Sequence, residues 1–202
     1  MKKLPIIILI VFAVTTLGII FFVDTYSENQ QTQATPPTAS NRQSAVVSVS
    51  PEESEDKETL TAEELTQQQL LYLIEEEKLA HDVYTVFYKE YGARIFGNIL
   101  ESESTHQEKV LTLLEARDIP DPRSSDVGVF TDSDLQNFYN ELIAQGMENE
   151  KEAIKAGIII EETDIADLQE QLSTTTDADV TSALEDLLKG SENHLRAFNR
   201  QI

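Results

Sequence analysis

Glu103 and His106 form a Glu-x-x-His pair that interrupts an otherwise apolar helical pattern. The pattern uses steps of three and four, which place all its members on one face of a helix: Phe96, Ile99, Glu103, His106, Val110 and Leu113. A carboxylate in that register is costly to bury unless another group pairs with it or an ion binds it. A carboxylate and an imidazole one turn apart are suited to binding a metal ion together.

Three further helical patterns carry an ionisable residue in the apolar register. In the first of these patterns the ionisable residue is Glu77, and the other members are Leu70, Leu73, Ala80, Tyr84, Phe87 and Tyr91. In the next pattern the ionisable residue is Glu161, and the other members are Ile154, Ile158, Ile165, Leu168 and Leu172. His194 and Ser191 share the last with Val180, Leu184, Leu187 and Phe198. Facing helices would gather five candidate metal ligands near the middle of a bundle: Glu77, Glu103, His106, Glu161 and His194.

The candidate ligands are carboxylates and imidazoles, because the sequence contains no cysteine. The lack of cysteine excludes a disulfide framework, thiol catalysis, an iron–sulfur cluster and a cysteine zinc site. Oxygen and imidazole ligands suit iron or manganese and, less specifically, zinc. One Glu on each of two helices, with Glu-x-x-His on each of the other two, is the arrangement of two-metal carboxylate sites in helical bundles.

Four long helices and one short helix are expected to position these residues. Apolar periodicity and helix-end signals predict long helices at about 62–91, 93–118, 149–173 and 177–200, and a short one at about 132–146. No stretch alternates with period two for long enough to indicate a strand. The predicted fold is therefore all-α: a four-helix bundle of two helical hairpins, joined by a crossover that contains the short helix.

With these residues in place, the chain resembles the ferritin-like superfamily, and rubrerythrin is the closest familiar pattern. Glu77, Ala80 and Tyr84 match its first-helix spacing, and Glu103 to His106 match its second-helix motif. The segments EEEKLAHDVY, FGNILESESTHQEKV, IEETDI and GSENHLRAF further resemble a ferritin-like family of bacteria and archaea that is known only as a domain of unknown function. The resemblance covers about residues 60–202. It implies a bundle with a metal centre, which in this superfamily can be di-iron, and no established substrate.

Ser191 departs from the two-iron pattern, which would have a Glu at this position. A single metal ion, or an asymmetric pair completed by Glu162, Asp164 or water, therefore stays open. Glu162 borders the face that carries Glu161, so it joins the candidate metal ligands.

Other polar residues near these motifs have simpler interpretations. His81, one turn after Glu77, is interpreted as a flanking polar residue rather than a ligand. Tyr84 is interpreted as a core tyrosine. Glu75 and Glu76 are interpreted as solvated charges on the first helix.

The N-terminal third of the chain does not share the helical patterning of the rest. Residues 1–23 contain two lysines followed by an apolar run long enough to cross a bilayer, and no clear cleavage site follows. We expect an uncleaved transmembrane anchor that places the chain after Asp24 outside the cytoplasm; secretion after signal cleavage is the alternative. Residues 24–59, rich in Ser, Thr, Gln, Pro and then acid, are expected to be a disordered linker before a domain at 60–202.

A formal net charge of −22 argues against binding to nucleic acid. The expected partners are metal ions and, through the N-terminal helix, a membrane; the oligomeric state is left open. Three functions remain. The first is an iron-dependent oxidase or peroxidase with a di-iron centre, the second a non-catalytic metal-binding module, and the third a metal-free structural or interaction bundle.

Overall fold

The structure is a computed structural model that describes residues 60–202. The anchor predicted at 1–23 and the linker predicted at 24–59 lie outside the described residues. Among the helices of the described part, none combines the length and the apolar composition that crossing a membrane requires.

The described part of the chain consists of five α-helices and no strands, as the all-α prediction requires. They are α1 (Ala62–Tyr91), α2 (Arg94–Glu115), α3 (Ser133–Gly146), α4 (Glu150–Thr174) and α5 (Ala178–Phe198). Each predicted helix is found close to its predicted bounds, and the short one is α3.

Local sequence signals define the ends of α1. The Thr61 hydroxyl accepts a hydrogen bond from the Glu64 backbone N–H at 3.2 Å, and the Glu64 carboxylate accepts one from the Thr61 N–H at 2.8 Å. This reciprocal capping box satisfies two backbone donors that the first turn leaves free. Gly92 ends the helix in the left-handed conformation, with φ 65°, which a residue without Cβ adopts without strain.

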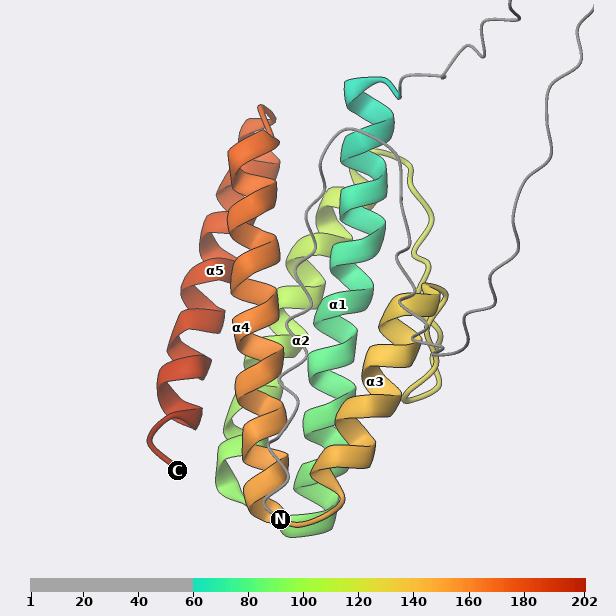
Figure 1. Cartoon of the computed structure of the whole chain (residues 1–202). Coiled ribbons are helices and arrows are strands. Elements are labelled where there is room, and N and C mark those ends of the chain that lie inside the picture. The colour runs from blue at the N-terminus through green and yellow to red at the C-terminus, as the bar shows by residue number, and fades with distance from the viewer. Residues whose placement is uncertain (1–59) are drawn as a thin grey trace, which may run out of the picture. The chain divides into compact units, whose positions relative to one another are not determined.

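The four long helices form a bundle, and α3 lies on its outside (Figure 1). α1 packs along α2 and α4 packs along α5, so the bundle consists of two helical hairpins. Contacts of α1 with α4, and of α2 with α5, join the hairpins. The crossover, which includes α3, returns the chain from the end of α2 to the opposite end of the bundle, and α3 packs against α1 and α4.

The bundle interior contains two apolar clusters separated by a polar layer. One cluster includes the aromatic side chains of Tyr84, Phe87, Phe96 and Phe198, and the other consists largely of leucines from the opposite halves of the same helices. Along each long helix, buried polar residues lie between the two clusters: Glu77, Glu103, His106, Glu161, Ser191 and His194. The polar layer is therefore enclosed by apolar packing on both sides.

Two helices bury more of their surface than the sequence patterns predicted. Glu75 and Glu76, interpreted above as solvated charges, are only 2% and 7% exposed. The interpretation was wrong because α3 covers α1 in addition to α2 and α4.

On α4, Asp164 is buried whereas Ile158 and Ile165 are only partly buried. This helix packs against α1, α3 and α5, so it buries more than one apolar stripe.

Candidate metal centre

Two groups of potential metal ligands share Glu103. Glu77, Glu103 and His106 form one group, and Glu103, Glu161 and His194 form the other. Within each group, one ligand atom of every residue lies within 4.8 Å of the others. All five residues are buried, and they come from all four long helices. The bundle thus brings together the five candidates that the helical registers indicated.

Both histidines face Glu103 with the same ring nitrogen. Nδ1 of His106 lies 3.1 Å from Oε2 of Glu77 and 3.3 Å from Oε2 of Glu103. Nδ1 of His194 lies 2.8 Å from Oε1 of Glu103 and 3.5 Å from Oε2 of Glu161. The two imidazole rings stack with their centroids 5.5 Å apart. Each oxygen of Glu103 therefore faces a different histidine, as the oxygens of a carboxylate bridging two ions would.

Several atoms of the two groups have no hydrogen-bond partner although they are buried. They are Oε1 of Glu77, Oε1 of Glu103 and Nδ1 of His194. The last two atoms are close enough for a charge interaction but lack the alignment of a hydrogen bond. Unpartnered buried polar atoms are rare and costly in folded proteins. A metal ion that accepts lone pairs from oxygen and imidazole would satisfy them, so these residues fit such an ion.

Burial and mutual interactions shift the pKa of every group at the centre. Burial raises the pKa of Glu77 and of Glu161 to about 7, against the opposing effect of the neighbouring histidines. Burial also disfavours the charged form of Glu103, but the two histidines outweigh it and lower its pKa to about 2. Burial opposes protonation of His106 and His194, yet the carboxylates raise their pKa to about 11 and about 10. Without metal, imidazolium protons therefore balance the carboxylate charge, and a cation would have to displace them.

Tyr84 connects the aromatic cluster to the centre. Its hydroxyl donates a hydrogen bond to Oε1 of Glu161 at 2.5 Å, while its ring packs 5.9 Å from Phe96 and 5.3 Å from Phe198. Tyr84 is thus a core tyrosine, as interpreted from the sequence, and it also fixes the orientation of a candidate ligand. Groups that hold ligands in this way influence metal affinity nearly as much as the ligands themselves.

Gly190 allows α5 to approach the ring of His106. A Cβ atom at position 190 would lie only 2.4 Å from Nε2 of His106, a distance at which the ring or the helix must move. The same nitrogen, Nε2, lies 3.4 Å from Oγ of Ser102. These contacts occupy Nε2 and leave Nδ1 free to face the carboxylates. Gly190 was not singled out from the sequence, although a glycine inside a helix already suggests a close approach, since it costs about 0.5–1 kcal/mol relative to alanine.

Ser191 lies in the polar layer where a fourth carboxylate would be expected, and its hydroxyl donates to the backbone carbonyl of Leu187 at 3.1 Å. Asp164 on α4 is buried near it, and Oδ1 of Asp164 has no hydrogen-bond partner. Burial and the charge of Glu77 raise the pKa of Asp164 well above its usual range, and interaction with the Ser191 hydroxyl opposes this effect. Asp164 is therefore a carboxyl group close to the centre and available to a ligand.

Two other residues considered from the sequence lie outside both ligand groups. Glu162 is exposed, because it points about 100° around α4 from Glu161. His81 is partly exposed, and its Nδ1 lies 3.5 Å from Oδ1 of Asp82. The structure therefore does not bring Glu162 to the centre, and it leaves His81 as a flanking residue.

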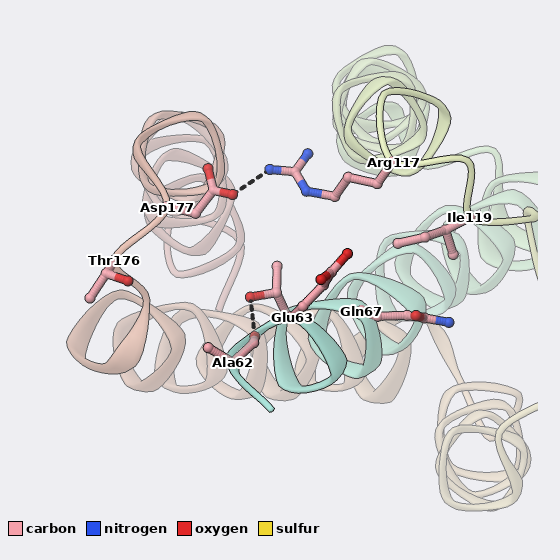
Figure 2. A pocket seen from close by; sticks show the side chains of 8 residues that line it. Ala62, Glu63, Gln67, Arg117, Ile119, Thr176 and Asp177 are labelled. Carbon is pink, nitrogen blue, oxygen red and sulfur yellow. Dashed lines mark hydrogen bonds and ion pairs between the residues drawn. The ribbon is translucent and has the colours of Figure 1, made fainter. Parts of the chain in front are cut away.

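A pocket of about 450 Å³ lies at one end of the bundle, near the start of α1 and the turn between α4 and α5 (Figure 2). The guanidinium of Arg117 donates to the carboxylate of Asp177 at 2.5 Å on its wall. The remaining lining residues are Ala62, Glu63, Thr66, Gln67, Ile119 and Thr176. None of the candidate metal ligands lines this pocket, so it is separate from the centre.

Comparison with known proteins identifies the family of the chain. Residues 66–202 match a family described as an uncharacterized protein domain, DUF2202. Uncharacterized protein MJ0754 of Methanocaldococcus jannaschii is 44% identical over 134 residues, which are 66% of this chain and 72% of that protein. The crystal structure of hypothetical protein MJ0754 from Methanococcus jannaschii is similar with a TM-score of 0.67 and 42% identity, covering 72% of this chain and 82% of that one. Since the family match spans more than half of the sequence, the chain belongs to the DUF2202 family of uncharacterised protein domains.

Proposed function

We propose that residues 60–202 form a ferritin-like domain that binds two transition-metal ions, with iron as the preferred metal. The observation that carries the proposal is the position of Glu103, whose Oε1 and Oε2 face His194 and His106 at 2.8 and 3.3 Å. Glu77 would complete the ligands of one ion and Glu161 those of the other. Manganese and zinc accept the same ligand types, so metal preference is part of the test.

Asp164 is the residue that we propose in place of the missing fourth Glu. Ser191 leaves the corresponding position on α5 without a carboxylate, and the buried Oδ1 of Asp164 has no hydrogen-bond partner. An aspartate on the neighbouring helix can supply an equivalent oxygen from a different direction. The resulting pair would be asymmetric, with different ligands around its two ions.

The activity that this centre supports best is that of an oxidase or peroxidase. When bound, reduced iron supplies the electrons for reducing oxygen or peroxide at open coordination positions. The protein contributes a site from which bulk water is largely excluded, since His106 and His194 are 5% and 8% exposed. It also holds Glu161 in place through Tyr84, and its histidines release their protons when the metal binds.

A non-catalytic metal-binding module is the second candidate. The specific observation in its favour is Ser191, because one carboxylate fewer weakens the case for a symmetric reactive pair. This function predicts reversible metal binding at the same residues without consumption of an oxidant.

Elemental analysis of the full-length chain, purified without chelator, tests these proposals first. We expect about two iron ions per chain, one for each ligand group, and none in the double variant Glu103→Ala, His106→Ala. Glu108→Gln, an exposed position on the same helix, serves as the control and should retain both ions. Oxidant consumption by the reduced, iron-loaded chain then separates an enzyme from a binding module. A chain that stays free of metal after reconstitution, and melts at the same temperature in chelator, would support the metal-free bundle instead.

A further inference from the structure

A row of carboxyl groups leads away from the candidate metal centre toward the surface. On α4, Asp164 and Asp167 follow Glu161 in steps of three residues, so each lies about 60° further around the helix and roughly 4.5 Å further along it than the one before. On α1, Glu76 lies among Asp164, Asp167 and Glu77, the charged groups that act on it. Glu76 and Asp164 are buried, whereas Asp167 is partly exposed.

Two buried members of this row each have one carboxyl oxygen without a hydrogen-bond partner. Oε2 of Glu76 and Oδ1 of Asp164 form no hydrogen bond. Within residues 60–202, no lysine or arginine forms an ion pair with Glu76, Asp164 or Asp167; all such pairs lie elsewhere. Buried carboxyl oxygens without a partner favour the approach of a cation, because leaving them unsatisfied is costly.

The row does not have the geometry of a third chelating site. Among the described residues, the sets of three ligand atoms within 4.8 Å of one another are the two groups at Glu103. At any position along the row, an ion would therefore contact only a few carboxyl oxygens. Such an arrangement suits passage of an ion better than its retention.

The outer end of the row lies in an acidic environment next to Tyr72. Burial raises the pKa of the Tyr72 phenol, and so do four nearby carboxylates, those of Glu76, Asp167, Asp132 and Asp134. The last two come from the start of α3, whose N-terminal end thus lies near this part of α1. Carboxylates gathered around a partly buried point concentrate cations there and raise the rate at which they arrive.

We propose that Asp167, Glu76 and Asp164 form the access route by which divalent transition-metal ions reach the centre. Asp167 receives the ion at the surface, Glu76 carries it inside, and Asp164 delivers it to Glu77 and Glu103. This inference rests on the proposed metal-binding function. It assigns a role to Asp167 and Glu76, which belong to neither ligand group, and makes Asp164, proposed above as a ligand, the inner end of the route.

The rate of metal uptake tests this route separately from the capacity of the centre. Metal-free full-length chain is mixed with Co²⁺ in a stopped-flow instrument, and binding is followed by the absorbance of the Co²⁺ ion. In Asp167→Asn and in Glu76→Gln we expect uptake to slow on the order of ten-fold, with the final number of bound ions unchanged. Glu185→Gln, which removes an exposed carboxylate from α5, is the matched control and should load at the original rate.

The possible results separate this inference from the proposed function. Uptake at the original rate in both variants would overturn the access route while leaving the metal centre intact. A lower final number of ions in either variant would also overturn it, because the residue would then be a ligand. Failure of the unmodified chain to bind Co²⁺ or iron would instead refute the metal-binding function on which the route rests.

Discussion

Oε1 of Glu103 on α2 lies 2.8 Å from Nδ1 of His194 on α5, although neither atom has a hydrogen-bond partner. The other oxygen of Glu103 faces His106 at 3.3 Å. Glu103 is therefore the point at which the ligands of the two helical hairpins meet. Several expected results follow from this position and from the side chains that surround it.

Glu103→Gln should remove both metal ions, because Glu103 belongs to both ligand groups. Glu77→Gln and Glu161→Gln each affect one group, so each should retain about one ion per chain. Elemental analysis after dialysis measures the difference, and Glu101→Gln, an exposed position on α2, is the control. Equal losses in all three ligand variants would contradict a shared carboxylate.

Metal binding should release protons near neutral pH. In the metal-free chain the carboxylates raise the pKa of His106 to about 11 and of His194 to about 10, above the ordinary value of about 6.5. Both imidazoles are therefore protonated at pH 7 and must lose a proton before they bind a metal ion. Calorimetric titration with Co²⁺ at pH 7, in buffers of different ionisation enthalpy, should show about three protons released per chain. Two come from the histidines, and about one in total comes from Glu77 and Glu161, whose pKa of about 7 leaves each half-protonated. If His106→Gln releases as many protons as the original chain, the protons do not come from this histidine, and the prediction is wrong.

The same pKa shifts predict how the stability of the metal-free chain depends on pH. A histidine whose pKa is raised by folding stabilises the fold fully below its unfolded pKa of about 6.5. That contribution is lost as the pH rises through the folded values of about 11 and about 10. Thermal unfolding in chelator should therefore show a midpoint that falls from pH 7 to pH 10. The midpoint should fall less in His106→Gln than in the original chain. Identical pH profiles of the two proteins would argue against the contacts of His106 with Glu77 and Glu103.

Gly190→Ala should disturb the position of His106, because the added Cβ would lie 2.4 Å from Nε2 of that ring. We expect one of the two ions to be lost while the His194 group keeps the other. Gly97→Ala is the matched control, since its Cβ would meet only the half-exposed ring of Tyr88. The substitution should lower the unfolding midpoint of the original chain but not that of His106→Ala, in which the clash is absent. A lower midpoint in both backgrounds would indicate a general packing defect.

Asp164→Asn should weaken binding of one ion by at least roughly 10–100-fold, because removing a proposed ligand costs no less than removing a group that only supports a metal site. The comparison is Glu162→Gln, which removes an exposed carboxylate from the same helix and should leave affinity unchanged. Competition between the protein and a chromogenic chelator for Co²⁺ provides the affinities. Weaker binding in Glu162→Gln, with no change in Asp164→Asn, would reverse the assignment of these two residues.

Glu75→Ala should destabilise the fold without changing metal content. The Glu75 carboxylate accepts backbone N–H bonds from Thr131 at 2.6 Å and from Asp132 at 2.9 Å, and so attaches the start of α3 to α1. Loss of hydrogen bonds to a buried charged acceptor costs about 1.5–3 kcal/mol each, before any rearrangement. Urea unfolding of the full-length chain measures this change, and Glu90→Ala at an exposed position of α1 should have little effect. A reduced metal count in Glu75→Ala would show that the centre depends on the position of α3.

The sequence alone determined the helices and the polar layer. Steps of three and four placed Glu77, Glu103, His106 and His194 in apolar registers, and the structure buries all four residues. Prediction succeeded here because helical periodicity is a local property, and a carboxylate in an apolar register has few interpretations. Caps such as Thr61 and Gly92 marked helix ends for the same local reason.

Only the tertiary structure decided which other residues surround the centre. Glu75 and Glu76 lie beside Glu77 in the sequence, yet one attaches α3 and the other faces α4. The contact between Gly190 and His106 depends on how closely α5 approaches α2. Any side of a helix can contact a neighbouring element, whereas the periodicity of the sequence identifies only its most apolar side. What covers the remaining faces depends on the neighbouring helices, and those contacts join residues that are distant in the sequence.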